Sequence, residues 1–194
     1  PAVFGESLAV AMGAIAWNRY PDRSATALRA RIAEIEGHEV PAGIGAANVF
    51  VANGSNEVLQ SVCLAYGGAG RSVLTSEPTY ALHSHIARVC GTEVSQTQRL
   101  NDCTSDVYSF VSQIVAVRPS ITFLWSPNNP TGAVTPPAVI RQIADLAIKH
   151  DILIVADEIY AKMIYAPNEH LSIATLPGMK DRTITLNGFS KTYA

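Results

Sequence analysis

The sequence predicts an α/β fold in which a mainly parallel β-sheet is sandwiched by helices. Short β-rich runs alternate along the chain with segments of helical apolar spacing, which is typical of strand–helix–strand crossover units. Residues 152–156 are apolar at every position, as expected of a strand buried on both sides. Hydrophobic residues make up 48% of the 194 residues and charged residues 15%, so the chain has enough apolar material for a large core.

The predicted elements follow one another in a regular order. Runs rich in β-branched and aromatic residues favour strands at 49–52, 72–75, 121–125, 152–156 and 183–186. Apolar spacing bounded by Gly or Pro predicts helices at 25–37, 57–66, 80–90, 106–117 and 138–150. The first twenty or so residues look irregular. We therefore divide the chain into an N-terminal segment, 1–24, which is a candidate arm toward a dimer partner or an active site, and one large domain, 25–194.

Composition excludes several classes of partner. The net charge of −2 gives no electrostatic basis for binding nucleic acid or an anionic membrane, and the apolar runs are too short to span a bilayer. The three cysteines lack metal-type spacing and fit a reducing, cytoplasmic setting. His83 and His85 lie two apart on a predicted helix and face different directions, so no metal site is expected.

Polar segments follow the predicted strands at the points where the strands end. These segments are 53–57, 77–80, 126–132, 157–160 and 187–191. In an open α/β sheet, ligands bind outside the carboxyl ends of the strands. The five segments are therefore expected to form one site at one edge of the sheet.

Four of these segments carry a family resemblance. Asn-Gly-Ser-Asn-Glu at 53–57, Ser-Pro-Asn-Asn-Pro-Thr-Gly at 126–132, Ala-Asp-Glu-Ile-Tyr at 156–160 and Gly-Phe-Ser-Lys-Thr-Tyr-Ala at 188–194 resemble those of class I and II aminotransferases. These are fold-type I enzymes that use pyridoxal 5'-phosphate. Residues 18–22 and the Pro-Thr-Tyr turn at 78–80 resemble the histidinol-phosphate aminotransferase branch, whereas 157–194 is more similar to aspartate or aromatic aminotransferases.

The resemblance implies an enzyme that moves an amino group between an amino acid, or histidinol phosphate, and a 2-oxo acid. It further implies a homodimer. The chain starts without Met and stops at Ala194, directly after a motif that should open a helix. We therefore expect that the C-terminal small domain is missing from this chain, together with the arginines that bind the cofactor phosphate and the substrate carboxylate.

Two charged residues carry the central chemistry that the resemblance implies. Lys191 would form an imine with the cofactor aldehyde and then move protons as a general acid and base; its alternative is a solvated surface lysine. Asp157 ends an apolar strand, where an unpaired carboxylate is costly, and would pair with the pyridinium nitrogen. Its alternative is a helix N-cap.

Two polar side chains are expected at the phenolic oxygen of the cofactor. The hydroxyl of Tyr160 and the amide of Asn129 would both donate to that oxygen and favour its anion. The resemblance also implies a cis peptide bond between Asn129 and Pro130. The alternatives are an ordinary packed tyrosine and a simple turn.

The cofactor phosphate is expected at a helix start. Gly54, Ser55 and Asn56 lead into a predicted helix whose free N–H groups suit an anion, and Ser190 would add a hydroxyl. Ser55 as a simple N-cap is compatible with this role.

Two tyrosines complete the expected site. Tyr80 would stack on the pyridine ring, or else is a packed aromatic residue at a helix start. Tyr20 resembles the tyrosine that reaches the cofactor phosphate of the partner subunit, although its segment is also a good turn sequence.

Other functions remain open at this point. The same cofactor chemistry serves lyases, decarboxylases and racemases, and orientation of the substrate over the ring chooses between them. A cofactor-sensing regulator fused to a DNA-binding module is a second class, and an inactive homologue is a third. No basic helix-turn-helix pattern is visible, and Lys191, Asp157, Asn129 and Tyr160 are all present, which favours the enzyme.

Overall fold

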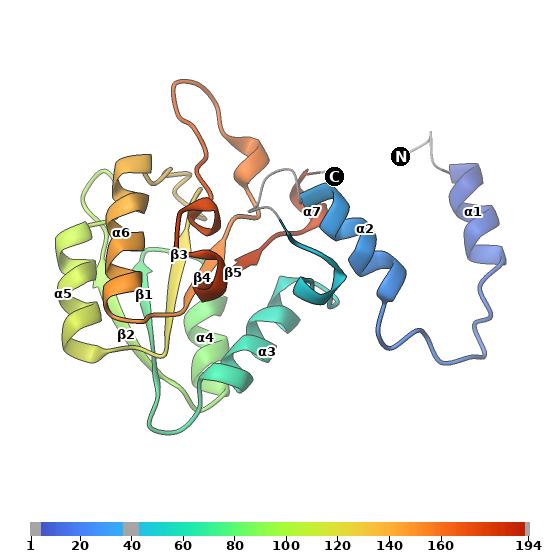
Figure 1. Ribbon diagram of the computed structural model, residues 1–194, viewed down its shortest axis with the longest axis horizontal. Coiled ribbons are helices and arrows are strands. Elements are labelled where there is room, and N and C mark those ends of the chain that lie inside the picture. Colours follow the sequence, from blue (N-terminus) through green and yellow to red (C-terminus); the bar gives the residue numbers. More distant parts are fainter. Residues whose placement is uncertain (1–4, 37–42, 193–194) are drawn as a thin grey trace.

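The core of the molecule is one five-stranded parallel sheet with the strand order β2-β1-β3-β4-β5. The computed structural model describes residues 5–36 and 43–192. The strands are β1 (Ser72–Glu77), β2 (Glu93–Gln98), β3 (Ile121–Trp125), β4 (Ile154–Asp157) and β5 (Thr183–Leu186). Because all strands run the same way, their carboxyl ends lie at one edge of the sheet. The predicted fold class is confirmed (Figure 1).

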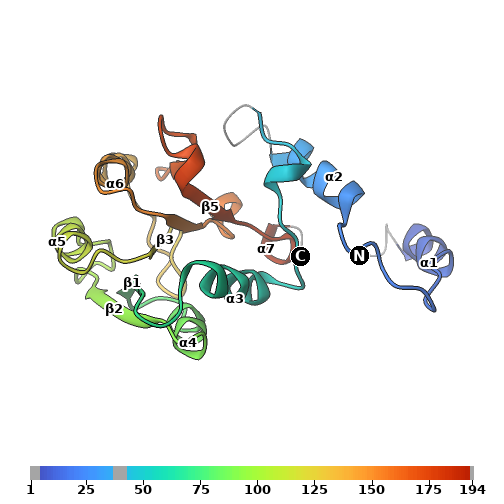
Figure 2. The same cartoon turned by 60° about the horizontal axis from the view of Figure 1, so that its bottom comes forward.

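Helices cover both faces of the sheet, as Figure 2 shows. On one face α3 (Ser55–Tyr66) and α4 (Leu82–Val89) pack through Leu59, Val62 and Ala87 onto strand residues such as Phe123 and Val155. On the other face α5 (Val107–Val117) and α6 (Pro137–Lys149) pack onto the opposite sides of the same strands. Successive side chains of a strand point to opposite faces, so a central strand with two covered faces must be apolar throughout.

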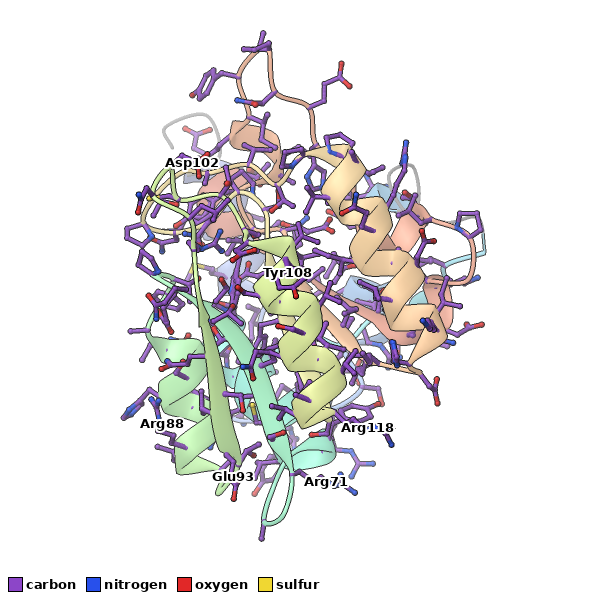
Figure 3. The ribbon with its side chains drawn as sticks, turned by 90° about the vertical axis from the view of Figure 1, so that its left-hand side faces the viewer. Arg71, Arg88, Glu93, Asp102, Tyr108 and Arg118 are labelled. Atoms are coloured by element: carbon purple, nitrogen blue, oxygen red, sulfur yellow. The ribbon has the colours of Figure 1, made fainter. Side chains whose placement is uncertain are left out.

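Figure 3 shows the molecule from the β2 edge of the sheet, with α5 in front. Asp102 follows β2 and lies near the carboxyl end of the strands. Arg71 and Arg118 precede β1 and β3 and lie near the opposite end. This view separates the carboxyl ends of the strands from their amino ends.

The N-terminal part stands apart from this domain. Helix α1 (Gly5–Gly13) has no buried residue and lies away from the sheet in both ribbon views (Figures 1 and 2). The expectation of irregular structure over the first twenty or so residues is therefore wrong for Gly5–Gly13. Helix α2 (Thr26–Glu36) is held partly by Arg29, whose guanidinium donates to the carbonyl of Ala46 at 2.6 and 2.9 Å.

One strand prediction is wrong, and one strand of the sheet was not predicted. Residues 49–52 are extended at Val49 but form no strand, because no neighbouring strand pairs with them within the described residues. Conversely, β2 was not predicted, because Glu93–Gln98 is largely polar and forms the edge of the sheet, where only one neighbour contributes hydrogen bonds. The other predicted elements are present, with ends displaced by up to two residues.

Short connections complete the described chain. They include the 3₁₀ turns at Ala46–Asn48, Ala161–Met163, Ile173–Thr175 and Lys180–Arg182, and the last helix, α7 (Phe189–Thr192). In the part of the chain that the structure describes, no helix has the length and apolarity needed to cross a membrane.

Candidate active site

A cavity of about 1160 Å³ runs along β5 and opens over the carboxyl ends of β3 and β4. Its walls come from α2, α3 and the loops that follow β3, β4 and β5. Nine of the ten predicted site residues line it: Gly54, Ser55, Asn56, Tyr80, Asn129, Asp157, Tyr160, Ser190 and Lys191. The shared cavity arises because parallel strands deliver the residues that follow them to the same edge of the sheet.

Asp157 is the last residue of β4, and a histidine holds its carboxylate. The side chain of Asp157 is 13% exposed, and its Oδ2 lies 3.1 Å from Nε2 of His83, whose side chain is fully buried. The other carboxylate oxygen, Oδ1, accepts a hydrogen bond from the backbone N–H of Ile159 at 3.3 Å. The carboxylate thus closes a short turn; it does not cap a helix, since the next 3₁₀ turn begins at Ala161.

His83 is itself fixed on two further sides. Its Nδ1 lies 2.9 Å from the backbone oxygen of Tyr80. The indole N–H of Trp125 points at the imidazole, with Nε1 3.2 Å from both ring nitrogens. The two rings meet edge to face with their centroids 5.3 Å apart, a favourable geometry for aromatic groups. Three contacts therefore define the orientation of the group behind Asp157.

Lys191 on α7, Tyr160 in the loop after β4 and Asn129 in the loop after β3 lie close together. The amide Nδ2 of Asn129 lies 3.5 Å from the Tyr160 hydroxyl, toward which it is directed as a donor. Nζ of Lys191 lies 5.9 Å from the centroid of the Tyr160 ring. The Asn129–Pro130 peptide bond is cis, as the resemblance implied. An amine, a phenol and an amide thus face a common space.

The start of α3 presents backbone N–H groups to the cavity. Gly54 occupies the N-cap position with φ +88°, a conformation that side-chain-bearing residues rarely adopt, and it gives no side-chain cap. Ser55 is the first helical residue, so it is not the N-cap. The N–H of Asn53, just before the helix, donates to the carboxylate of Glu57 in the first turn at 2.8 Å. The following N–H groups of the first turn suit an anion.

Of the remaining predicted residues, Tyr80 and Ser190 line the cavity and Tyr20 does not. Tyr80 lines the cavity, and its ring meets His83 edge-on with 5.5 Å between centroids. Ser190 lines it from α7, beside Lys191. Tyr20 is fully exposed, at 101%, and does not line the cavity, so this chain's own site does not include it.

Sequence reasoning missed two residues that support the site. His83 was considered only as a metal ligand; in the structure it lies in the first turn of α4, three residues after Tyr80 in the preceding turn. His83 is buried and His85 is exposed, as their spacing predicted. Asn128 accepts a hydrogen bond from Thr79 Oγ1 at 2.7 Å and donates to the carbonyl of Pro78 at 3.1 Å. It thereby ties the β3 loop to the turn that carries Tyr80.

Comparison with known proteins places the chain in a family. A family model described as aminotransferase class I and II matches residues 12–194. A histidinol-phosphate aminotransferase of Thermobifida fusca is 45% identical over 154 residues, which are 79% of this chain and 40% of that protein. A histidinol-phosphate aminotransferase of Frankia casuarinae is 38% identical over 187 residues, which are 96% of this chain and 47% of that protein. The chain therefore spans less than half the length of these relatives.

Solved structures agree with this assignment. An aromatic aminotransferase from Pyrococcus horikoshii superposes over the whole chain and 52% of its own length, with a TM-score of 0.83 and 28% identity. An alanine aminotransferase from Pyrococcus furiosus gives a TM-score of 0.86 at 27% identity, over the whole chain and 49% of its own length. The chain belongs to the class I and II aminotransferase family.

Proposed function

We propose that the protein transfers an amino group between an amino acid and a 2-oxo acid with the help of bound pyridoxal 5'-phosphate. The observation that carries this proposal is the convergence of Lys191, Asp157, Tyr160 and Asn129 on one cavity next to a helix start. Family membership supports the same reaction.

The residues present fit this cofactor group by group. The first turn of α3 offers N–H groups to a phosphate, and Ser190 offers a hydroxyl. Asp157, with its mostly buried carboxylate, suits a protonated ring nitrogen, because such a charge needs a partner. Asn129 and Tyr160 suit a phenolic oxygen, and the primary amine of Lys191 suits an aldehyde. When bound, the cofactor supplies an electron sink that stabilises negative charge at the substrate Cα.

The side chains of this chain have separate tasks in the reaction. Lys191 would hold the cofactor through Nζ, and its free amine would accept and return the proton of the substrate Cα. Asp157 would pair with the protonated ring nitrogen, and His83 holds the Asp157 carboxylate in place. Tyr80 limits movement of the ring on one face, which fixes the bond to be broken relative to Lys191 Nζ.

The substrate and the assembly extend the proposal. Relatives of the chain are named histidinol-phosphate aminotransferases, so we include histidinol phosphate among the amino donors. Residues 1–24 would act as the arm, placing Tyr20 at the cofactor phosphate of the partner subunit in a homodimer, and 25–194 would form the cofactor-binding domain. The exposure of Tyr20 and of α1 supports this role. A cytoplasmic location fits the unpaired cysteines.

Absorption and chemical trapping test the proposal. The full-length protein, purified with pyridoxal 5'-phosphate, should absorb visible light, and borohydride should fix the cofactor on the peptide that contains Lys191. A panel with histidinol phosphate, phenylalanine and aspartate, each with 2-oxoglutarate, should yield glutamate from at least one donor. A colourless protein that does not bind the cofactor contradicts the proposal. A coloured protein that releases CO₂, or ammonia with a 2-oxo acid, and forms no glutamate indicates a decarboxylase or a lyase.

A further inference from the structure

Arg99 is a buried cation that lies outside the cavity. It directly follows β2 and is only 9% exposed. Burial lowers the pKa of its guanidinium below the ordinary value. Among the described residues no carboxylate forms an ion pair with it. Burying a charge in this way is costly, so its contacts need an explanation.

The contacts of Arg99 lead to the turn that carries Tyr80. Its Nε donates to the carbonyl oxygen of Pro78 at 3.1 Å, two residues before Tyr80. Asn128 donates to the same carbonyl at 3.1 Å. Nη1 of Arg99 donates to the carbonyl of Cys103 at 3.2 Å and to Ser105 Oγ at 3.4 Å, and these bonds fix Arg99 to the loop after β2. Arg99 thus stabilises the turn at Pro78, and its own position is fixed by the loop after β2.

A second set of contacts leads to Asp157. The Arg99 guanidinium carbon lies 5.8 Å from the centroid of the Trp125 ring, within the range of a cation–π interaction. The indole N–H of Trp125 points at His83 at 3.2 Å, and His83 holds the carboxylate of Asp157 at 3.1 Å. Each of these groups except Asp157 is at least nine-tenths buried. Arg99, Trp125, His83 and Asp157 therefore form a continuous packed series.

We infer that Arg99 is a positioning residue, which fixes both the Tyr80 ring and the His83–Asp157 pair relative to the bound cofactor. It acts through the Pro78 carbonyl on one side and the Trp125 indole on the other. Both tasks use the planar guanidinium, which donates in fixed directions while it lies over a ring. A lysine ammonium has no planar fork, so it cannot donate in the same fixed directions while it lies flat on a ring. The inference rests on the proposed function, because it assigns Arg99 a role toward the cofactor.

Substitution at Arg99 in the full-length protein loaded with pyridoxal 5'-phosphate tests this role. Arg99→Lys keeps the charge without the planar fork, and Arg99→Met keeps most of the volume without the charge. The matched control is Arg88→Met, because Arg88 is exposed on α4 and lies at the opposite end of the β2 face from Asp102 (Figure 3). The readouts are the circular dichroism that the protein induces in the visible band of the cofactor, and the dissociation constant of the cofactor.

Both Arg99 variants should lose at least half of the induced circular dichroism, as expected when ring orientation is no longer fixed. Their dissociation constants for the cofactor should rise about ten-fold, the change expected on losing one hydrogen bond to a charged group. Arg88→Met should match the wild type in both readouts. The far-ultraviolet spectrum of Arg99→Lys should stay unchanged, so its result decides the matter even if Arg99→Met does not fold.

Two outcomes overturn the inference in distinguishable ways. If the wild type shows a normal visible band and Arg99→Lys matches it in both readouts, the planar guanidinium has no positioning role, although the proposed function stands. If the wild type itself binds no cofactor, the proposed function fails, and the role of Arg99 fails with it.

Discussion

Nε2 of His83 lies 3.1 Å from Oδ2 of Asp157, so a fully buried imidazole supports the carboxylate at the end of β4. The two residues are 74 positions apart in sequence. They meet because α4, which carries His83, packs on a face of the sheet that contains β4. A carboxylate held in this way has one oxygen oriented by His83 and the other by the N–H of Ile159. Its direction toward the cavity is therefore set before any ligand binds.

Replacement of His83 should weaken catalysis without removing the covalent attachment site. His83→Phe keeps a ring in the aromatic cluster but removes the hydrogen bond to Asp157, and loss of a bond to a charged group corresponds to roughly a 10–100-fold effect. We expect kcat to fall by that factor while borohydride still labels Lys191. The exposed residue two positions on provides the control, since His85→Phe should leave kcat unchanged. Wild-type kcat in His83→Phe would contradict the supporting role.

Lys191→Ala should abolish both covalent attachment and proton transfer. A placed acid–base group contributes on the order of 10²–10⁴ in rate, so kcat should fall by at least that much. Mass spectrometry after borohydride treatment should find no cofactor-modified peptide. Lys149→Ala, at an exposed position in the last turn of α6, serves as the control and should retain full labelling. Labelling of any other lysine in Lys191→Ala would count against the assignment.

Tyr160→Phe should change the pH response of the bound cofactor. The phenolic oxygen of the bound cofactor would lose one of its two donors and keep Asn129 alone. Its anion would be less stabilised, so the proton that it shares with the imine nitrogen would be held more tightly. The pH midpoint of the visible absorption change should therefore move upward, measured by spectrophotometric titration. Tyr165→Phe is the control, because Tyr165 is 80% exposed and lies outside the cavity lining. An unchanged midpoint in Tyr160→Phe would show that its hydroxyl does not reach the cofactor.

Ile143→Ala should destabilise the fold. Ile143 is 1% exposed in the cluster between α6 and the sheet, and such truncations typically cost about 2–5 kcal/mol in the free energy of unfolding. Ile148→Ala on the same helix, where the side chain is 41% exposed, should cost well under half as much. Denaturant titration of both variants gives the comparison. Equal losses would mean that burial in this cluster does not determine stability.

The central strands and most helices were predictable because their signals are local. The β-rich runs of β3 and β5 predicted both strands with the observed ends, and Pro marked the end of α5 and the start of α6. The strand predicted at 49–52 failed for a non-local reason, since its β propensity needs a hydrogen-bonding neighbour. The polar strand β2 was missed because β1 pairs with it over its whole length, and sequence alone does not show that pairing.

The site was predictable to a similar degree. Asp157 ends a strand, and Lys191, Tyr160 and Asn129 follow strands, so the parallel direction of the strands brings all four to one edge. His83 escaped detection because its function depends on contact with a residue far away in sequence. Arg99 escaped for the same reason: an arginine after a polar strand is usually solvated, and only packing against Trp125 reveals that it is buried.

The position of β5 at the end of the sheet has a practical consequence for handling the polypeptide. β5 pairs with β4 on one side, and its other side borders the cavity. A strand with an open side is a template for a strand from another molecule. Because no strand of the described residues pairs with that side, the polypeptide of residues 1–194 should self-associate at high concentration and scatter light, and lysines introduced along Thr183–Leu186 should keep it dispersed.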